Sequence, residues 1–309
     1  MTDNVKSYIN DCIEHDVLFE MFGNQLYELN KADYEDLIAQ MSLLLEETDT
    51  LSTKSAVNKI LSSFDDIILQ YKKNLKERLN DNAAEIAKKE SSFLKNLFLT
   101  AFGISLFIPS KTSRLIPLAS YSNQNTVDTF ADNFSKKVES AYKNAVMTAY
   151  VMGTPKNELS ETIKQTTDTL EKNLETESKN IATGLQRQTR NYIYLKNEKK
   201  ISFVWNSILD SSTCLVCGEM HGKRFNNISQ VPGLPPLHLN CRCSIIAVPE
   251  DTKVEMPSYS EWLEEQSEET QREVLGKTRY NLYKNGIKID NFVNNGKKLT
   301  LDEIYKKNV

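Results

Sequence analysis

Residues 201–248 read ISFVWNSILDSSTCLVCGEMHGKRFNNISQVPGLPPLHLNCRCSIIAV, and this stretch decides how the chain is organised. It begins with a run rich in β-branched and aromatic residues, 201–205, and it ends with a second such run, 244–248. Both runs predict β-strands. Four cysteines and two histidines lie between them, among glycines and prolines. We therefore expect a small β module built around these side chains.

The module carries two motifs with the spacing of metal ligands. Cys214-Leu-Val-Cys217 places two thiols on one side of a tight turn, and His238-Leu-Asn-Cys241-Arg-Cys243 follows twenty residues later. These five side chains are candidates for the four positions of a tetrahedral site. Sulfur ligands with one imidazole favour zinc, and four protein ligands leave no open position for a reactive water. We expect a structural zinc site that uses four of the five.

The alternative is that these cysteines are reduced thiols packed in a small core. If the ion is present, replacing Cys214 or Cys217 is expected to release it and to unfold mainly residues 201–248.

The composition of the 309-residue chain, 39% hydrophobic and 26% charged, is typical of globular proteins. The longest apolar run, 93–108, contains Lys95 and Asn96 and is shorter than the roughly 18 residues of a membrane span, so it predicts a buried core helix. The first residues show no signal-peptide pattern, and we expect synthesis in the cytosol and no membrane partner. Clustered cysteines in a cytosolic chain favour metal binding over disulfides. Cys12 lies outside the cluster, in an apolar helical stripe, and is expected to be buried.

Apolar residues recur at helical spacing from residue 3 to about 200. The clearest stripe consists of Leu61, Phe64, Ile67, Ile68, Tyr71 and Leu75. Residues 108–125 are expected to form a loop, and a helix over 126–152 should stop at Gly153. The fold class is predicted to be α+β and mostly α. Long helices form the N-terminal and middle regions, and a small zinc-finger-like module of two or three strands is followed by short helices.

Four regions along the chain are expected from these patterns. They are a helical region 1–124, a helical middle 125–200, the Cys/His β module 201–250 and a helical tail 251–309.

Charge is distributed unevenly, with a balance of −10 over residues 1–50, +7 over 51–200 and −1 over 201–309. Within the basic part, the run 186–200 holds five basic residues, one acid and interleaved tyrosines. Such a run is typical of phosphate contacts and base stacking, although a solvated helix face has the same composition. The candidate contacts to DNA are Arg187, Arg190, Lys196, Lys199 and Lys200. Binding would be independent of DNA sequence, and removing the acidic residues 1–50 is expected to tighten it.

A wider pattern surrounds the cysteines. It consists of Trp205, Leu209-Asp210-Ser-Ser-Thr213-Cys214, Cys217, His221-Gly222-Lys-Arg-Phe225, Pro235-Pro236-Leu-His238 and Cys241-Arg242-Cys243. This pattern resembles the C-terminal domain of phage Mu F-like head-morphogenesis proteins, which are also called minor head or minor capsid proteins. The resemblance is strong over 201–248 and extends over about 125–309, where it includes Ser258-Tyr-Ser-Glu-Trp262-Leu. Leu239 stands where family members commonly have Pro, which leaves the ligand positions untouched.

The resemblance implies a low-copy internal protein of a tailed-phage head that associates with the portal protein during procapsid assembly. Its expected location is the virion and, during assembly, the host cytoplasm. Some relatives bind DNA without sequence preference and influence its ejection. The family offers no agreed catalytic residue, and we expect the protein not to be an enzyme.

An alternative function is a zinc-fingered, nuclease-like enzyme that acts on nucleic acid, because Asp210 and His221 flank the Cys-x-x-Cys motif. Such an enzyme would need a second set of ligands for a catalytic metal, and the chain has only three histidines, His15, His221 and His238. We therefore interpret Asp210 as the cap of one turn and His221-Gly222 as the start of another.

Overall fold

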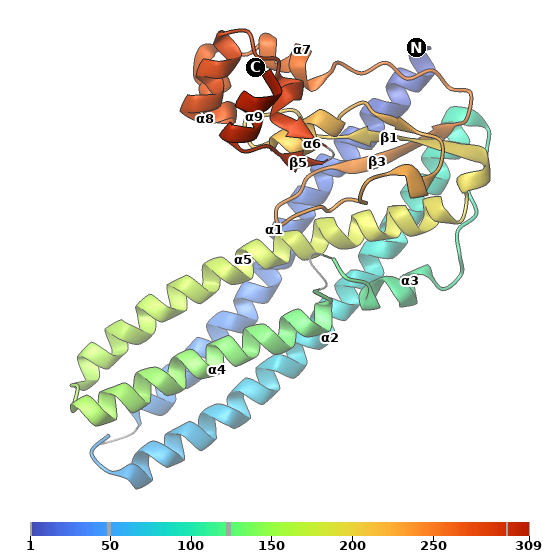
Figure 1. Ribbon diagram of the computed structural model, residues 1–309. Coiled ribbons are helices and arrows are strands. Elements are labelled where there is room, and N and C mark those ends of the chain that lie inside the picture. Colours follow the sequence, from blue (N-terminus) through green and yellow to red (C-terminus); the bar gives the residue numbers. More distant parts are fainter. Residues whose placement is uncertain (1, 48–50, 122–124, 295, 309) are drawn as a thin grey trace. The chain divides into compact units, whose positions relative to one another are not determined.

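The computed structural model describes residues 2–47, 51–121, 125–294 and 296–308, and most of them are helical. The helices are α1 (Asp3–Glu46), α2 (Lys54–Phe102), α3 (Thr112–Leu115), α4 (Val127–Met152), α5 (Lys156–Leu195), α6 (Leu215–Met220), α7 (Tyr259–Glu264), α8 (Glu268–Lys284) and α9 (Leu301–Asn308) (Figure 1). The strands are β1 (Ile201–Asn206), β2 (Arg224–Phe225), β3 (Ser244–Pro249), β4 (Val293–Asn294) and β5 (Lys297–Lys298). The predicted fold class, α+β and mostly α, is confirmed.

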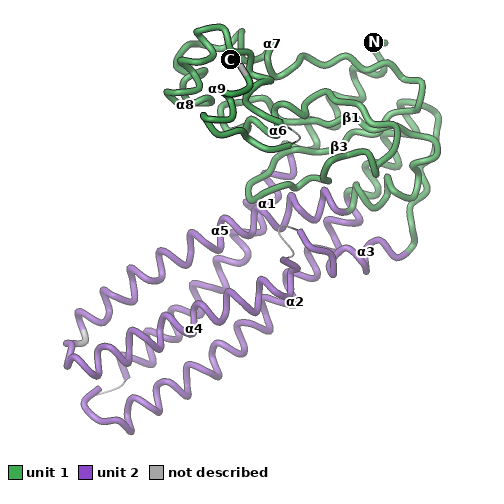
Figure 2. The backbone as a smooth tube through the Cα atoms, in the orientation of Figure 1, with its two compact units in different colours: residues 1–17, 90–110, 189–309 green, residues 18–89, 111–188 purple. Residues whose placement is uncertain are grey.

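The chain forms two compact units, coloured separately in Figure 2. Unit 1 comprises residues 1–17, 90–110 and 189–309, and unit 2 comprises residues 18–89 and 111–188. Each of the long helices α1, α2 and α5 therefore contributes residues to both units. The four regions expected along the sequence remain a prediction.

Unit 2 is built from segments of α1, α2, α4 and α5, with the short α3. Its core is aromatic: the ring centroid of Tyr34 lies 5.9 Å from that of Phe134, and the centroids of Phe64 and Tyr142 are 6.1 Å apart. The hydroxyls of Tyr142 and Thr167 lie 2.7 Å apart, which satisfies a polar group inside this core. In the predicted stripe of α2, Phe64, Ile68, Tyr71 and Leu75 are buried. The helical periodicity thus identified the correct face of α2.

Helix α4 has the ends that its sequence predicts. Thr126 is the N-cap, and its side chain accepts a hydrogen bond from the amide of Thr129, whose own hydroxyl accepts from the amide of Thr126. Gly153 ends the helix in the left-handed conformation, with a φ of 65°.

Unit 1 contains a three-stranded antiparallel sheet in the order β2-β1-β3. Val204 of β1 pairs with Ile246 of β3, and every residue of β1 is buried. Residues from the end of α2 join this core, including Leu94 and Phe98, so the helical part of the predicted apolar run contributes to the core. The helix ends at Phe102, and Phe107 near the end of the run is 62% exposed, so the rest of the run is not a buried helix. Cys12 of α1 is also buried here, as expected. No helix in the described parts of the chain is long and apolar enough to span a membrane.

The last part of unit 1 packs against α6. Leu215 of α6 shares an apolar cluster with Tyr259, Leu263 and Ile304 from α7 and α9. The contact is close, because a Cβ atom added to Gly218 would lie 2.6 Å from the ring of Tyr259. The segment after the sheet is therefore packed onto the helix that carries the Cys-x-x-Cys motif.

Candidate metal centre

The Cys-x-x-Cys motif lies at the start of α6. Cys214 is the N-cap residue in an extended conformation, and its Sγ accepts a hydrogen bond of 3.4 Å from the amide of Cys217. This single helical turn brings both sulfur atoms to the same side. An amide donor directed at sulfur stabilises its charged form, and thiolate is the form that binds metal.

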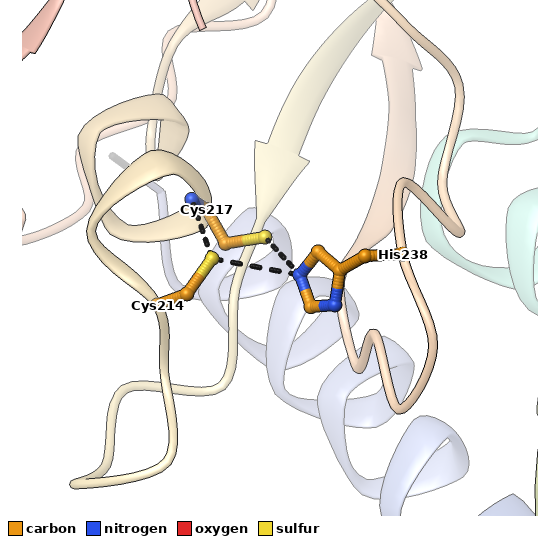
Figure 3. Close-up of side chains that lie close together, drawn as sticks. All are labelled: Cys214, Cys217 and His238. Atoms are coloured by element: carbon orange, nitrogen blue, oxygen red, sulfur yellow. Dashed lines mark hydrogen bonds between the residues drawn. The ribbon is translucent and has the colours of Figure 1, made fainter. Parts of the chain in front are cut away.

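His238 approaches the same two sulfur atoms from the loop before β3 (Figure 3). Its Nε2 atom lies 3.5 Å from Sγ of Cys214 and 3.3 Å from Sγ of Cys217. A zinc tetrahedron with ordinary Zn–S and Zn–N bonds has S···N edges of about 3.6 Å, so the spacing fits one ion. Nδ1 lies 2.8 Å from the carbonyl oxygen of Leu239. An Nδ1–H donor there leaves Nε2 free to coordinate a metal.

Leu239 contributes its carbonyl oxygen to this arrangement, while its side chain is 43% exposed. Any residue, proline included, has this carbonyl. The replacement of the common Pro by Leu therefore leaves the His238 contact intact.

Cys241 and Cys243 complete the sulfur cluster. The Sγ atoms of Cys217, Cys241 and Cys243 all lie within 4.8 Å of one another, and the ligand atoms of Cys214, Cys217 and His238 satisfy the same limit. Cys217 belongs to both groups, so the five predicted ligands form two groups of three that overlap at this sulfur. The cluster can hold a metal ion.

The side chains of the cluster differ in their pKa values. Hydrogen bonds with Cys217 lower the pKa of Cys214 to about 4 and that of Cys241 to about 2, while the pKa of Cys217 is raised by the same contacts. For Cys243 the bond with Cys217 lowers the pKa, but the bond with Cys241 and burial outweigh it and raise the pKa to about 12. The hydrogen bond with Cys214 raises the pKa of His238 to about 9. Binding of a metal cation would therefore displace protons from the metal-free cluster.

The loop that carries His238 is held from two sides. Asn191 of α5 donates a hydrogen bond of 3.0 Å to the carbonyl oxygen of Pro235. Arg242 forms a bidentate ion pair with Asp210, whose Oδ1 also accepts from the amide of Ser212 at 2.9 Å. Asp210 thus caps its turn, as the sequence predicted. Asn191 was missed, because nothing in its local sequence indicates a partner 44 residues away.

His221 has a different environment from His238. It follows α6 at a turn, as predicted, and its Nδ1 accepts a hydrogen bond of 3.0 Å from the amide of Ser207. Burial lowers the pKa of His221 to about 4, so the ring is neutral at pH 7. The contribution of Ser207 was not predicted from the sequence, because a single serine after a strand carries no motif.

Comparison with known proteins relates the part of the chain that contains this cluster to a protein family. The family model described as "Phage Mu protein F like protein" matches residues 136–246. This segment is phage Mu F-like. It includes all five candidate metal ligands, whereas the resembling motif at Ser258 lies beyond the end of the match. No curated protein and no solved structure matches the chain.

The Mu F-like family is one of phage head-morphogenesis proteins. The match covers 111 of the 309 residues, so it shows the family of this segment alone.

The predicted DNA contacts of the Mu F-like segment divide into two groups. Arg187 and Arg190 are buried, at 1% and 0% exposure, so the interpretation as a solvated, DNA-facing surface does not apply to them. Arg187 donates to Oε1 of Gln186, and Arg190 pairs with acids from α1 and α2. The three lysines of the set, Lys196, Lys199 and Lys200, are exposed.

Proposed function

We propose that the protein is a minor head protein of a tailed bacteriophage, a low-copy internal component that associates with the portal protein during procapsid assembly. The observation that carries this proposal is the Mu F-like match over residues 136–246. The match includes β1, the first three residues of β3 and the complete Cys/His cluster, so it covers the most distinctive part of unit 1. The protein would be present in the host cytoplasm during assembly and then in the virion.

The Cys/His cluster would hold one zinc ion, bound by four of Cys214, Cys217, His238, Cys241 and Cys243. The support is the donor set, which is rich in sulfur, and the S···N distances of 3.3 and 3.5 Å, which fit a zinc tetrahedron. With four protein ligands the ion would be structural. It would link α6, the His238 loop and the start of β3, and this would stabilise a module with few long elements.

Inside a filled head the protein would meet DNA phosphates at high concentration. Exposed Lys196, Lys199 and Lys200 would provide weak binding that is independent of sequence, because each phosphate contact releases counterions. Through such contacts the protein would assist DNA ejection. Some other basic residues of 51–200 are paired with acids in unit 2, for example Lys72 with Asp132 at 2.9 Å.

Mass spectrometry of purified procapsids and virions tests the assignment. The protein should be present in procapsids in low copy number relative to the major capsid protein, and it should co-purify with the portal protein. A phage-encoded replication protein from the same lysate serves as the control for contamination. Absence of the chain from both particles would overturn the proposal. Metal-dependent cleavage of DNA by the purified protein would instead favour the nuclease-like alternative.

A further inference from the structure

Ser207 lies between the end of β1 and the turn at Asp210, and its side chain is buried at 2% exposure. Its hydroxyl oxygen accepts a hydrogen bond of 3.0 Å from Nε1 of Trp205. The same hydroxyl donates to the carbonyl oxygen of Cys217 at 2.7 Å and lies 3.3 Å from Sγ of Cys243. One hydroxyl group thus contacts two of the five candidate ligands, which come from α6 and from the residue before β3.

The position of Ser207 is itself fixed. Its amide donates to Nδ1 of His221 at 3.0 Å, while Trp205 and His221 are 0% and 9% exposed. Buried hydrogen bonds of this kind are not replaced by water when they are lost, so they hold their partners in one arrangement. Trp205 and His221, two residues of the sequence pattern that are not candidate ligands, therefore both form hydrogen bonds with Ser207.

We infer that Ser207 is a positioning residue of the metal centre, and this inference rests on the proposed zinc site. By donating to the Cys217 carbonyl and lying against the Cys243 sulfur, Ser207 sets the separation of α6 from the strand that follows Cys243. Outer-shell partners of this kind orient metal ligands, and their loss typically weakens metal binding about 10- to 100-fold. Trp205 and His221 act through Ser207.

Cobalt(II) titration of the full chain tests the inference, because cobalt in a thiolate site has a visible spectrum that reports ligand geometry. We expect Ser207→Ala to bind cobalt(II) about 10- to 100-fold more weakly than the unchanged protein and with altered bands. Zinc affinity, measured by competition with cobalt(II), should fall by a similar factor.

Ser202→Ala is the matched control. Ser202 is fully buried in β1 and accepts a hydrogen bond from Arg224, so the control also removes one buried hydroxyl and its bond. This variant should keep its cobalt(II) affinity within about threefold and its spectrum unchanged, because a purely structural loss does not alter the geometry of the ion.

The outcomes separate the inference from the proposal on which it rests. If the unchanged protein binds neither cobalt(II) nor zinc, the zinc site itself is wrong. If it binds both and Ser207→Ala has the same affinity and spectrum, the zinc site stands and the role of Ser207 is overturned. An equal loss in Ser202→Ala overturns it as well.

If Ser207→Ala does not fold, Trp205→Phe takes its place. Phenylalanine keeps an aromatic ring and removes the indole N–H that reaches Ser207. The folded variant, checked by circular dichroism, should bind cobalt(II) severalfold more weakly and with shifted bands. Unchanged binding in a folded Trp205→Phe protein overturns the inference.

Discussion

Nε of Arg190 lies 2.6 Å from Oε1 of Glu90, and both side chains are fully buried. Nη2 of Arg190 also lies 2.8 Å from Oδ1 of buried Asp16, and His15 contacts Glu90 at 2.7 Å. Arg190 therefore joins α1, α2 and α5 inside unit 1. The local sequence around Arg190 predicts a contact with DNA, but in the structure this residue has a structural role.

Replacing Arg190 by Met is expected to lower the free energy of unfolding by about 3–5 kcal/mol, because Asp16 and Glu90 would remain buried without their cation. Lys196→Met is the control in the turn that follows the same helix, since Lys196 is exposed, and it should change stability by less than about 0.5 kcal/mol. Urea denaturation followed by circular dichroism measures both values. Equal, small effects of the two substitutions would show that the ion pairs contribute little.

The exposed lysines give a separate prediction about DNA. Changing Lys196, Lys199 and Lys200 together to Glu should weaken binding to DNA of any sequence and reduce its salt dependence. The control reverses three exposed lysines of the C-terminal part, Lys288, Lys306 and Lys307, and has the same net charge. Fluorescence anisotropy at low salt compares the proteins. The surface assigned to DNA would be wrong if both triple variants lose affinity equally.

Deleting residues 1–50, which the sequence suggested as a way to tighten DNA binding, would damage the fold instead. Within this segment Asp3–Glu46 form α1, and Tyr8, Cys12, Leu26 and Tyr34 from this helix are buried. The acidic head is also partly neutralised within the protein, since Asp33 pairs with Arg78 at 2.7 Å and Asp16 pairs with Arg190.

His221 should make stability depend on pH. Burial lowers its pKa from 6.5 in the unfolded chain to about 4 in the folded protein, so the folded state excludes a proton that the unfolded state binds. This contribution to stability is complete above pH 6.5 and is lost as the pH falls toward 4. His221→Asn keeps an acceptor for the Ser207 amide but does not titrate in this range.

The stability of the unchanged protein relative to His221→Asn should therefore decrease between pH 7 and pH 4.5. Because Asn keeps the acceptor that holds the Ser207 amide, loss of a metal at low pH should affect both proteins alike, and the difference then reports on His221. A difference that stays constant over this range, measured by urea denaturation, would show that His221 is not held neutral by burial.

Removal of the metal should destabilise more of the chain than residues 201–248. Leu215 of α6 packs with Tyr259, Leu263 and Ile304, and the hydroxyl of Tyr259 donates to the carbonyl of Thr213 at 3.1 Å. We expect a zinc chelator to reduce hydrogen-exchange protection in α7 and α9 as well as in α6. Amides of α4 provide the internal reference. Loss of protection confined to 201–249 would contradict this coupling.

Sequence patterns predicted those structural features that depend on residues close together in the sequence. Thr126 and Gly153 mark the ends of α4 because capping depends on neighbouring residues. The spacing of Cys214, Cys217 and His238 indicated the cluster because two short motifs contain all its ligands. The burial of Arg190 could not be predicted in this way, since Glu90 is 100 residues and Asp16 is 174 residues distant in sequence. Ser207 was missed for a similar reason, because Cys243 is 36 residues away.

The most direct test of the account is the metal content of the purified protein. It is determined by elemental mass spectrometry on protein that was purified in buffers without a chelator. We predict about one zinc per chain. Cys214→Ser and Cys217→Ser should lose the ion, whereas Cys12→Ser should keep it, because Cys12 lies outside the cluster. Retention by Cys243→Ser would assign the four positions to Cys214, Cys217, His238 and Cys241. Two results together would contradict the zinc site. The unchanged protein would contain no zinc, and the double variant Cys214→Ser, Cys217→Ser would have the same melting temperature as the unchanged protein.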